Sequence, residues 1–297
     1  MINLAPINYA KVFAEKGGPI SRLDYARATV FGKSCFQAVA CIKEGLVSEQ
    51  VRPQTLTAQP DGAGTHVSAQ IACYMAISEA LERWAVFYGR SNLQALDYGL
   101  KIDGSSNGFA AFPGLLKRQA RGAAKIESIE RHCLLCWWEG LIGHREISDL
   151  PGAVSGIELE NPFSREFMVV LWSASDRSRS IAFGAGKSLK QAIWRAGVEC
   201  ARTETLVKKI EQHLQTHPEV PVTNIYERRI HHFASEAGFS KFSDRLKARA
   251  GGHPKKIRFL FDHEIKGPWS SYTRVWRTII EPPSWDYLSD SPDYFFW

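Results

Sequence analysis

The sequence predicts an α/β protein of the α+β kind, folded as one domain. Long segments with helical periodicity alternate with short apolar runs, and glycine-rich stretches separate them. The composition is that of an ordinary globular protein, with 44% hydrophobic and 23% charged residues among 297. Because no linker or low-complexity stretch interrupts the chain, we expect a single domain over residues 1–297.

Residues 1–60 are expected to form a strand-bearing N-terminal segment. Its short apolar runs, typical of strands, lie at residues 28–31 and 36–42. The stretch 60–64, Pro-Asp-Gly-Ala-Gly, is typical of a turn. We therefore expect a helix to begin just after this turn.

Residues 61–214 contain one pattern three times, a glycine-rich turn followed by a long helix with acidic residues. The turns lie at residues 60–64, 103–108 and 184–186. The helices are predicted at residues 65–88, 115–138 and 189–214. Two strands, at 167–174 and 180–183, are expected to form a hairpin before the third helix.

Residues 215–297 follow a different pattern. Strands are predicted at 222–226, 256–261 and 271–280, and a helix at 233–249. The tail, residues 285–297, is aromatic and acidic. It could pack in the core, into the mouth of the chain's own active site, or against a neighbouring molecule, and the sequence leaves these alternatives open.

Two of the predicted helices carry the same Glu-x-x-Glu-Arg motif. The first copy comprises Glu79, Glu82 and Arg83, and the second comprises Glu127, Glu130 and Arg131. Glutamates three residues apart lie on one face of a helix, where like charges repel. One copy alone would be interpreted as exposed helix charges. Two copies in apolar surroundings favour a polyvalent cation, and magnesium with a nucleotide phosphate is the usual case for oxygen ligands.

Other residues could complete such a site. Glu199 on the third helix could join the four glutamates, and the arginine of each motif could neutralise them or contact a phosphate. The turns around Ser105-Ser106-Asn107-Gly108 and Gly184-Ala185-Gly186-Lys187 offer groups suited to an anion, although such stretches are more often plain turns. Neither turn is a Walker A loop. His66 could contact phosphate, but a capping or surface role is favoured.

Several functional classes find little support. The six cysteines are scattered, and Cys133-x-x-Cys136 lies in an apolar stretch, which favours buried structural thiols over a metal or redox pair. No nucleophile motif is present. The net charge of +6 is spread over short runs, so nucleic-acid binding is not indicated. We see neither a secretory signal nor a membrane span, and expect a cytoplasmic protein.

Three stretches, taken together and in order, resemble the YcaO family. They are residues 76–83 with the first glutamate pair, residues 106–131 with Ser-Asn-Gly and the second pair, and residues 184–199 with Gly-Ala-Gly and Ala-x-x-Arg-Ala-x-x-Glu. Members of this family use ATP to activate a backbone amide of a peptide. The resemblance implies a YcaO-like domain whose long acidic helices surround a nucleotide site.

The resemblance also implies roles for individual residues, with ATP and Mg²⁺ as the bound groups. The magnesium ligands would be Glu79, Glu82, Glu127 and Glu130. The nucleotide would be contacted by Ser106, Asn107, Arg131, Glu199 and an arginine of the last strand, Arg277 or Arg274. The expected products are azolines, thioamides or amidines, with azoline-forming cyclodehydration favoured.

The sequence departs from the family pattern at three places. Ala63 stands where a lysine is common, Arg202 stands where a glutamine is common, and the chain ends without a Pro-x-Pro-x-Pro tail. Two alternatives to an active enzyme on peptides stay open, and Ala63 and Arg202 motivate the first of them. One is a non-catalytic scaffold subunit of a synthetase complex, and the other is a nucleotide-dependent ligase acting on a small molecule. We expect a precursor peptide as substrate and a separate leader-binding or TfuA-like partner protein, with a homodimer also open.

Overall fold

The computed structural model describes residues 4–48, 52, 54–56, 60–91, 98–99, 106–175, 178–289 and 291–296. Its contacts divide the chain into two compact units that interleave in sequence. The first unit comprises Met1–Pro53, Gln59–Ser128 and Arg258–Glu281, and the second comprises Gln54–Ala58, Ile129–Ile257 and Pro282–Trp297. The α/β class is confirmed, and the described residues pair into three antiparallel sheets. The expectation of one domain stays a prediction.

The first sheet of the first unit begins with a long hairpin. After a short helix α1 (Ala5–Asn8), strands β1 (Ile20–Val30) and β2 (Lys33–Ile42) pair, and β3 (Gly62–His66) joins β2. Phe31 and Gly32 form the hairpin turn with φ of 51° and 71°. Positive φ at both positions gives a turn whose twist matches that of the paired strands. The predicted strands at 28–31 and 36–42 overlap this hairpin, which is longer than expected.

The second sheet of the first unit joins segments that are distant in sequence. Its order is β4 (Asn107–Phe112), β10 (Arg274–Ile280) and β9 (Phe259–Ile265). Helix α3 (Lys117–Trp138) begins in this unit, and Arg121 on it forms a 2.5 Å ion pair with Asp262 on β9. This contact attaches the helix that carries the second glutamate motif to the sheet.

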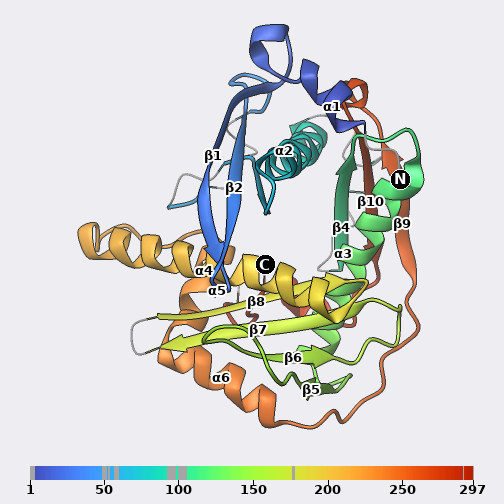
Figure 1. Ribbon diagram of the computed structural model, residues 1–297. Helices are drawn as coiled ribbons and strands as arrows, with labels where there is room; N and C mark the ends of the chain where they lie inside the picture. The colour runs from blue at the N-terminus through green and yellow to red at the C-terminus, as the bar shows by residue number, and fades with distance from the viewer. Residues whose placement is uncertain are drawn as a thin grey trace. The chain divides into compact units, whose positions relative to one another are not determined.

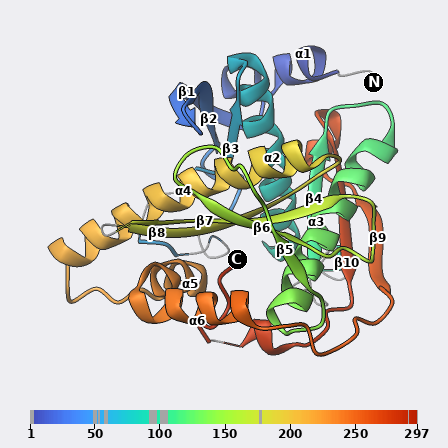
Figure 2. The same ribbon diagram turned by 60° about the horizontal axis from the view of Figure 1, so that its bottom comes forward.

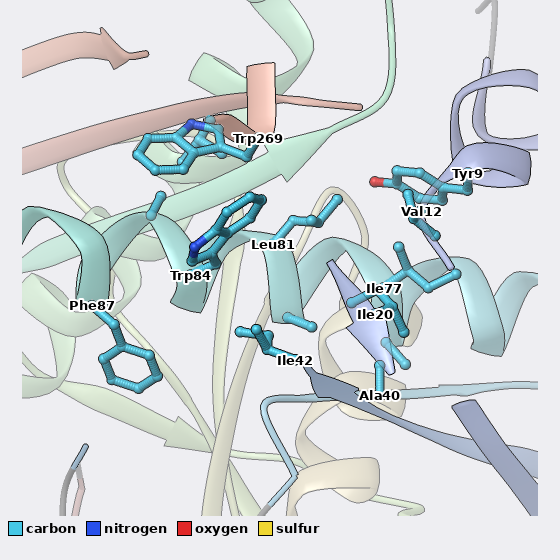
Figure 3. Packing of buried hydrophobic residues seen from close by; sticks show 14 of the residues in the cluster. Tyr9, Val12, Ile20, Ala40, Ile42, Ile77, Leu81, Trp84, Phe87 and Trp269 are labelled. Atoms are coloured by element: carbon cyan, nitrogen blue, oxygen red, sulfur yellow. The ribbon is translucent and has the colours of Figure 1, made fainter. Parts of the chain in front are cut away.

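Helix α2 (Ala69–Ser91) lies between the two sheets of the first unit (Figure 1). Its apolar side chains Ile77, Leu81 and Trp84 recur at helical spacing and are buried. The ring of Trp84 packs edge-on against Trp269 with centroids 5.9 Å apart, as Figure 3 shows. Burial of each such side chain contributes about 2 kcal/mol, so this core holds α2, and with it the first glutamate motif, firmly in place.

The second unit is built on a four-stranded sheet in chain order. Its strands are β5 (His144–Glu146), β6 (Ser155–Leu159), β7 (Phe167–Ser175) and β8 (Ser178–Gly186). Helix α4 (Leu189–Thr216) covers one face of this sheet (Figure 2). Helices α5 (Ile225–Ala234) and α6 (Glu236–Lys247) lie on the other side, where Phe242 contacts Trp172 of β7.

The aromatic tail is part of the core of the second unit. Phe295 and Phe296 are buried, and Phe295 contacts Trp137, Phe233 and Phe242. Of the three placements that the sequence left open, the structure therefore shows a core contact for residues 294–296. Trp297 lies outside the described residues.

Four predicted elements are wrong, and each has a physical reason. Residues 62–64 and 184–186 belong to strands, because their glycines serve close packing and not a turn. The strand predicted at 222–226 is instead the start of α5, since Asn224 caps that helix by accepting hydrogens from the amides of Tyr226 and Glu227. The helix predicted at 233–249 is interrupted at Ser235, which caps α6.

Two predicted strands differ in extent. Strand β9 is shifted toward the C-terminus relative to 256–261, and β10 is shorter than 271–280. Strands β5 and β6 have no counterpart in the sequence prediction. No described helix is long and apolar enough to cross a membrane.

Candidate functional site

The helix of the first glutamate motif lies directly on the backbone of strand β3. A Cβ atom at Gly62 would come within 2.1 Å of the carbonyl oxygen of Ala76, and one at Gly64 would come equally close to that of Ala72. Only glycine on the strand and small residues on the helix allow this approach. The glycines that precede the motif are therefore explained by packing against α2.

Glu79 hydrogen-bonds to the edge of this strand. Its Oε2 accepts the backbone hydrogen of Ala63 at 2.9 Å, on the side of β3 that faces away from β2. Its Oε1 accepts from Arg83 at 2.9 Å, and Arg83 also donates to the carbonyl of Pro60. The carboxylate thus satisfies an edge amide and fixes the register of α2 on β3. We call this type of contact, from a helix side chain to an edge strand, an edge anchor.

The second motif repeats the arrangement. Strand β4 is also at the edge of its sheet, and a Cβ atom at Gly108 would lie 2.0 Å from the carbonyl oxygen of Ala124 on α3. Oε2 of Glu127 accepts the backbone hydrogen of Phe109, the residue after the glycine, at 2.9 Å. In both copies the anchoring glutamate lies three residues after the alanine that touches the glycine. This equivalence of the two copies was not predicted from the sequence. The shared spacing of glycine, alanine and glutamate is the sequence feature that indicates it.

The second glutamate of each motif lies nearly one turn further along its helix. Glu82 on α2 and Glu130 on α3 are half-buried and share a helix face with the anchoring residue, as predicted. Among the described residues, no group of three or more His, Cys, Asp or Glu side chains is close enough to hold a metal ion by itself. The role of Glu79, Glu82, Glu127 and Glu130 as metal ligands stays a prediction.

The residues expected to contact a nucleotide in the first unit lie at the start of β4 and on β10. Ser106 is buried, its carbonyl accepts from the amide of Ile280 at 2.8 Å, and Asn107 begins β4. Arg277, opposite Phe109 in the sheet, is fully buried. Its Nη1 donates to the carbonyl of Tyr98 at 2.9 Å, and its guanidinium lies 4.7 Å from the ring centre of Phe109. Ser105 lies outside the described residues.

Arg274, the alternative to Arg277, has a different environment. Its Nη1 forms a 2.8 Å ion pair with Glu264 on the neighbouring strand β9. That pair, together with Lys117 on the other oxygen of Glu264, lowers the pKa of the Glu264 carboxyl despite the opposing effect of its burial. Arg274 is therefore held by a structural ion pair, as Arg277 is held by its hydrogen bond to Tyr98, and the role of either arginine toward a nucleotide stays a prediction.

Three predicted site residues belong to the second unit: the proposed metal ligand Glu130 and the proposed nucleotide contacts Arg131 and Glu199. Arg131 is half-buried on α3, and Glu199 is exposed on α4. Glu199 accepts a hydrogen bond of 2.7 Å from Arg202. Arg202 is the residue that stands where a glutamine is common in the family pattern. The roles of Arg131 and Glu199 toward a nucleotide stay predictions.

The remaining candidates have structural roles. Burial raises the pKa of the Cys136 thiol to about 12 and that of Cys133 well above its usual range, so both are buried structural cysteines. Nδ1 of His66 accepts the amide hydrogen of Ser68 just before α2, which fits the capping role. The anion site considered at residues 184–187 is not supported, because Gly184 and Gly186 pack against α4 and Ser188 caps that helix.

The sequence matches no protein-family model and no curated protein sequence. Among solved structures, YcaO from Methanopyrus kandleri bound with AMPPCP and Mg²⁺ is similar over 97% of this chain and 91% of its own, with a TM-score of 0.55 and 13% sequence identity. A heterocyclase in complex with substrate and cofactor matches 91% of this chain and half (50%) of its own, with a TM-score of 0.47 and 12% identity. The similarity to the M. kandleri protein shows that this chain has a YcaO-like fold.

Proposed function

We propose that the chain is an enzyme that uses ATP and magnesium to activate a backbone amide of a ribosomally made peptide, most directly in azoline-forming cyclodehydration. The observation that carries the proposal is the pair of edge anchors, which fixes both Glu-x-x-Glu-Arg helices in one register on their strands. The M. kandleri YcaO of similar fold is bound with AMPPCP and Mg²⁺, which supports the choice of ligands.

The donor set fits magnesium held together with a nucleotide. Magnesium usually takes one or two carboxylates, keeps some water and binds phosphate oxygens, so it needs no preformed cage of protein ligands. Each motif helix presents two carboxylates nearly one turn apart, which is the number that one such ion requires. The proposed ligands are Glu79, Glu82, Glu127 and Glu130, and the proposed nucleotide contacts are Ser106, Asn107, Arg131, Glu199 and Arg277. Bound magnesium would neutralise charge that develops on the phosphates.

The proposed reaction balances without an added oxidant or reductant. A cysteine, serine or threonine side chain of the peptide loses its proton and adds to the carbonyl carbon of the preceding amide. The former amide oxygen attacks the γ-phosphorus of ATP and ADP leaves. Loss of the amide N–H proton and of phosphate then forms the C=N bond of the azoline. The protein would act by positioning and electrostatics, as in phosphoryl transfer generally.

The same site would serve thioamide or amidine formation if an external sulfur or nitrogen nucleophile replaced the peptide side chain. A non-catalytic scaffold subunit is the second candidate, and two ion pairs favour it. Arg83 and Arg202 neutralise Glu79 and Glu199 within the chain. In either case we propose that a separate protein, leader-binding or TfuA-like, delivers the precursor peptide.

An isotope experiment tests the proposed reaction. Peptides recovered with the protein are resynthesised with ¹⁸O in the backbone amides and incubated with ATP and magnesium. We expect ¹⁸O in the released phosphate and a peptide lighter by one water. Glu82→Gln and Glu130→Gln should abolish both signals, whereas Glu204→Gln, which alters an exposed pair with Lys208 on α4, should retain them. Phosphate without ¹⁸O, or full activity in either motif variant, would refute the proposal.

A further inference from the structure

The third strand–helix connection has the same packing as the two that carry the glutamate motifs. Strand β8 is at the edge of its sheet, like β3 and β4. A Cβ atom at Gly184 would lie 2.5 Å from the amide nitrogen of Ala196 and 2.9 Å from the carbonyl oxygen of Ala192. Helix α4 therefore lies on β8 in the register that α2 and α3 adopt on their strands.

The edge anchor of this third connection is an arginine. Arg195 lies three residues after Ala192, at the position that Glu79 and Glu127 occupy in their helices. Its Nη1 donates to the carbonyl oxygen of Ala185, the residue after the glycine, at 3.0 Å. The N–H and C=O of one strand residue point to the same edge. The same point on an edge strand can therefore be held by a carboxylate through N–H or by a guanidinium through C=O.

The charge pattern of the third helix is the reverse of the first two. Residues 76–83 and 124–131 read Ala-x-x-Glu-[Ala/Ser]-x-x-Arg, and residues 192–199 read Ala-x-x-Arg-Ala-x-x-Glu. Glu199 thus takes the place of Arg83 and Arg131, one turn beyond the anchor. We infer that Arg195 is a positioning residue, which holds α4 on β8 and thereby places Glu199. That Glu199 contacts a nucleotide rests on the proposed function.

Because Arg195 is exposed, a positioning role of this residue can be distinguished from a contribution to global stability. The side chain is exposed, so its hydrogen bond contributes little to global stability, and its loss should be visible in local order and in ligand affinity. Ser188 provides the contrasting control, because its Oγ caps the same helix by accepting from the amide of Gln191. Removing this cap should lower the melting temperature and leave the anchor intact.

Two measurements on the full chain test the inference. Hydrogen exchange without nucleotide should show faster exchange at residues 184–187 in Arg195→Ala. Arg195→Glu should restore protection, because its carboxylate can accept the amide hydrogen of Ala185 as Glu79 accepts that of Ala63.

Calorimetry with ATP and magnesium should show affinity for ATP about tenfold weaker in Arg195→Ala than in wild type, as expected for a misplaced contact. Arg195→Lys, which can still donate to Ala185, should bind within about threefold of wild type.

The controls are Lys190→Ala, which removes an exposed charge from the same helix, and Ser188→Ala; both should bind ATP as wild type does. Unchanged exchange in Arg195→Ala overturns the anchor. Affinity in Arg195→Ala equal to that of Lys190→Ala, or Arg195→Lys as weak as Arg195→Ala, overturns the positioning role. A wild-type chain that binds no ATP overturns the proposed function together with the nucleotide part of this inference, while hydrogen exchange decides the anchor independently.

Discussion

The Oε2 atom of Glu79 lies 2.9 Å from the backbone nitrogen of Ala63 and accepts its hydrogen. Replacing Glu79 by alanine should leave that edge amide without its acceptor and cost about 1.5 kcal/mol of unfolding free energy. Glu79→Gln keeps an acceptor and loses only the half-exposed ion pair with Arg83, so we expect a cost of about 0.5 kcal/mol. Urea denaturation measures both. Equal effects of the two changes would argue against the edge anchor.

Gly108 and Gly122 provide a matched pair of substitutions around one helix. A Cβ atom at Gly108 would lie 2.0 Å from the carbonyl oxygen of Ala124, so Gly108→Ala should force α3 away from β4 and cost about 3 kcal/mol. Nothing lies within 4 Å of a Cβ atom at Gly122 on α3, so Gly122→Ala should stabilise the protein by about 0.5 kcal/mol. Thermal unfolding compares them. A tolerated Gly108→Ala would show that the close strand–helix contact is not required.

Burial lowers the pKa of His132 from 6.5 to about 4. The folded state therefore keeps this ring neutral between these values, while the unfolded state takes up a proton. The resulting stability is fully present above pH 6.5 and is lost as the pH falls toward 4, with a loss of about 2 kcal/mol already at pH 5. Unfolding of wild type and His132→Gln should be measured from pH 8 to 5. We expect a flatter pH dependence in the variant, and parallel curves would contradict the assigned pKa.

The buried tail allows a test of its role in the core. Phe295 is fully buried among Trp137, Trp138, Phe233 and Phe242, so Phe295→Ala should cost about 4 kcal/mol of unfolding free energy. Trp285, at the start of the same tail, is 52% exposed, and Trp285→Ala should change stability by less than about 0.5 kcal/mol. Similar costs at the two positions would mean that the tail does not pack as described.

The long helices were predictable because their apolar periodicity is strong, and the predicted helix ends lie within a few residues of α2, α3 and α4. The glycines at residues 62–64 and 184–186 were wrongly predicted to form turns. A sequence does not distinguish a glycine that permits a turn from one that lets a helix backbone approach a strand, which is the role of Gly62 and Gly184. The C-terminal errors arose where a cap decides the structure, as Asn224 does for α5.

The candidate site is proposed from charge repulsion between glutamates and from the family resemblance, and the roles of its residues toward magnesium and nucleotide stay predictions. The sequence did not predict the division of roles within each motif, because this division depends on tertiary contacts. Only the structure shows that Glu79 and Glu127 each bind an edge amide, and that Arg195 takes their place in the third helix with the opposite charge. These contacts join residues 10 to 18 positions apart, beyond the reach of local helical patterns.

The central claim is that the two motif helices form a magnesium–nucleotide site, and calorimetric titration with ATP tests it most directly. The wild-type chain should bind ATP in the presence of magnesium and lose that binding when magnesium is chelated. Glu82→Gln and Glu130→Gln should each weaken ATP binding at least about tenfold while leaving the fold intact, since each removes one carboxylate ligand. Glu204→Gln should bind as wild type does. Absence of magnesium-dependent binding in the wild type, alone and with a partner protein of the proposed kind, or full affinity in both motif variants, would contradict the account.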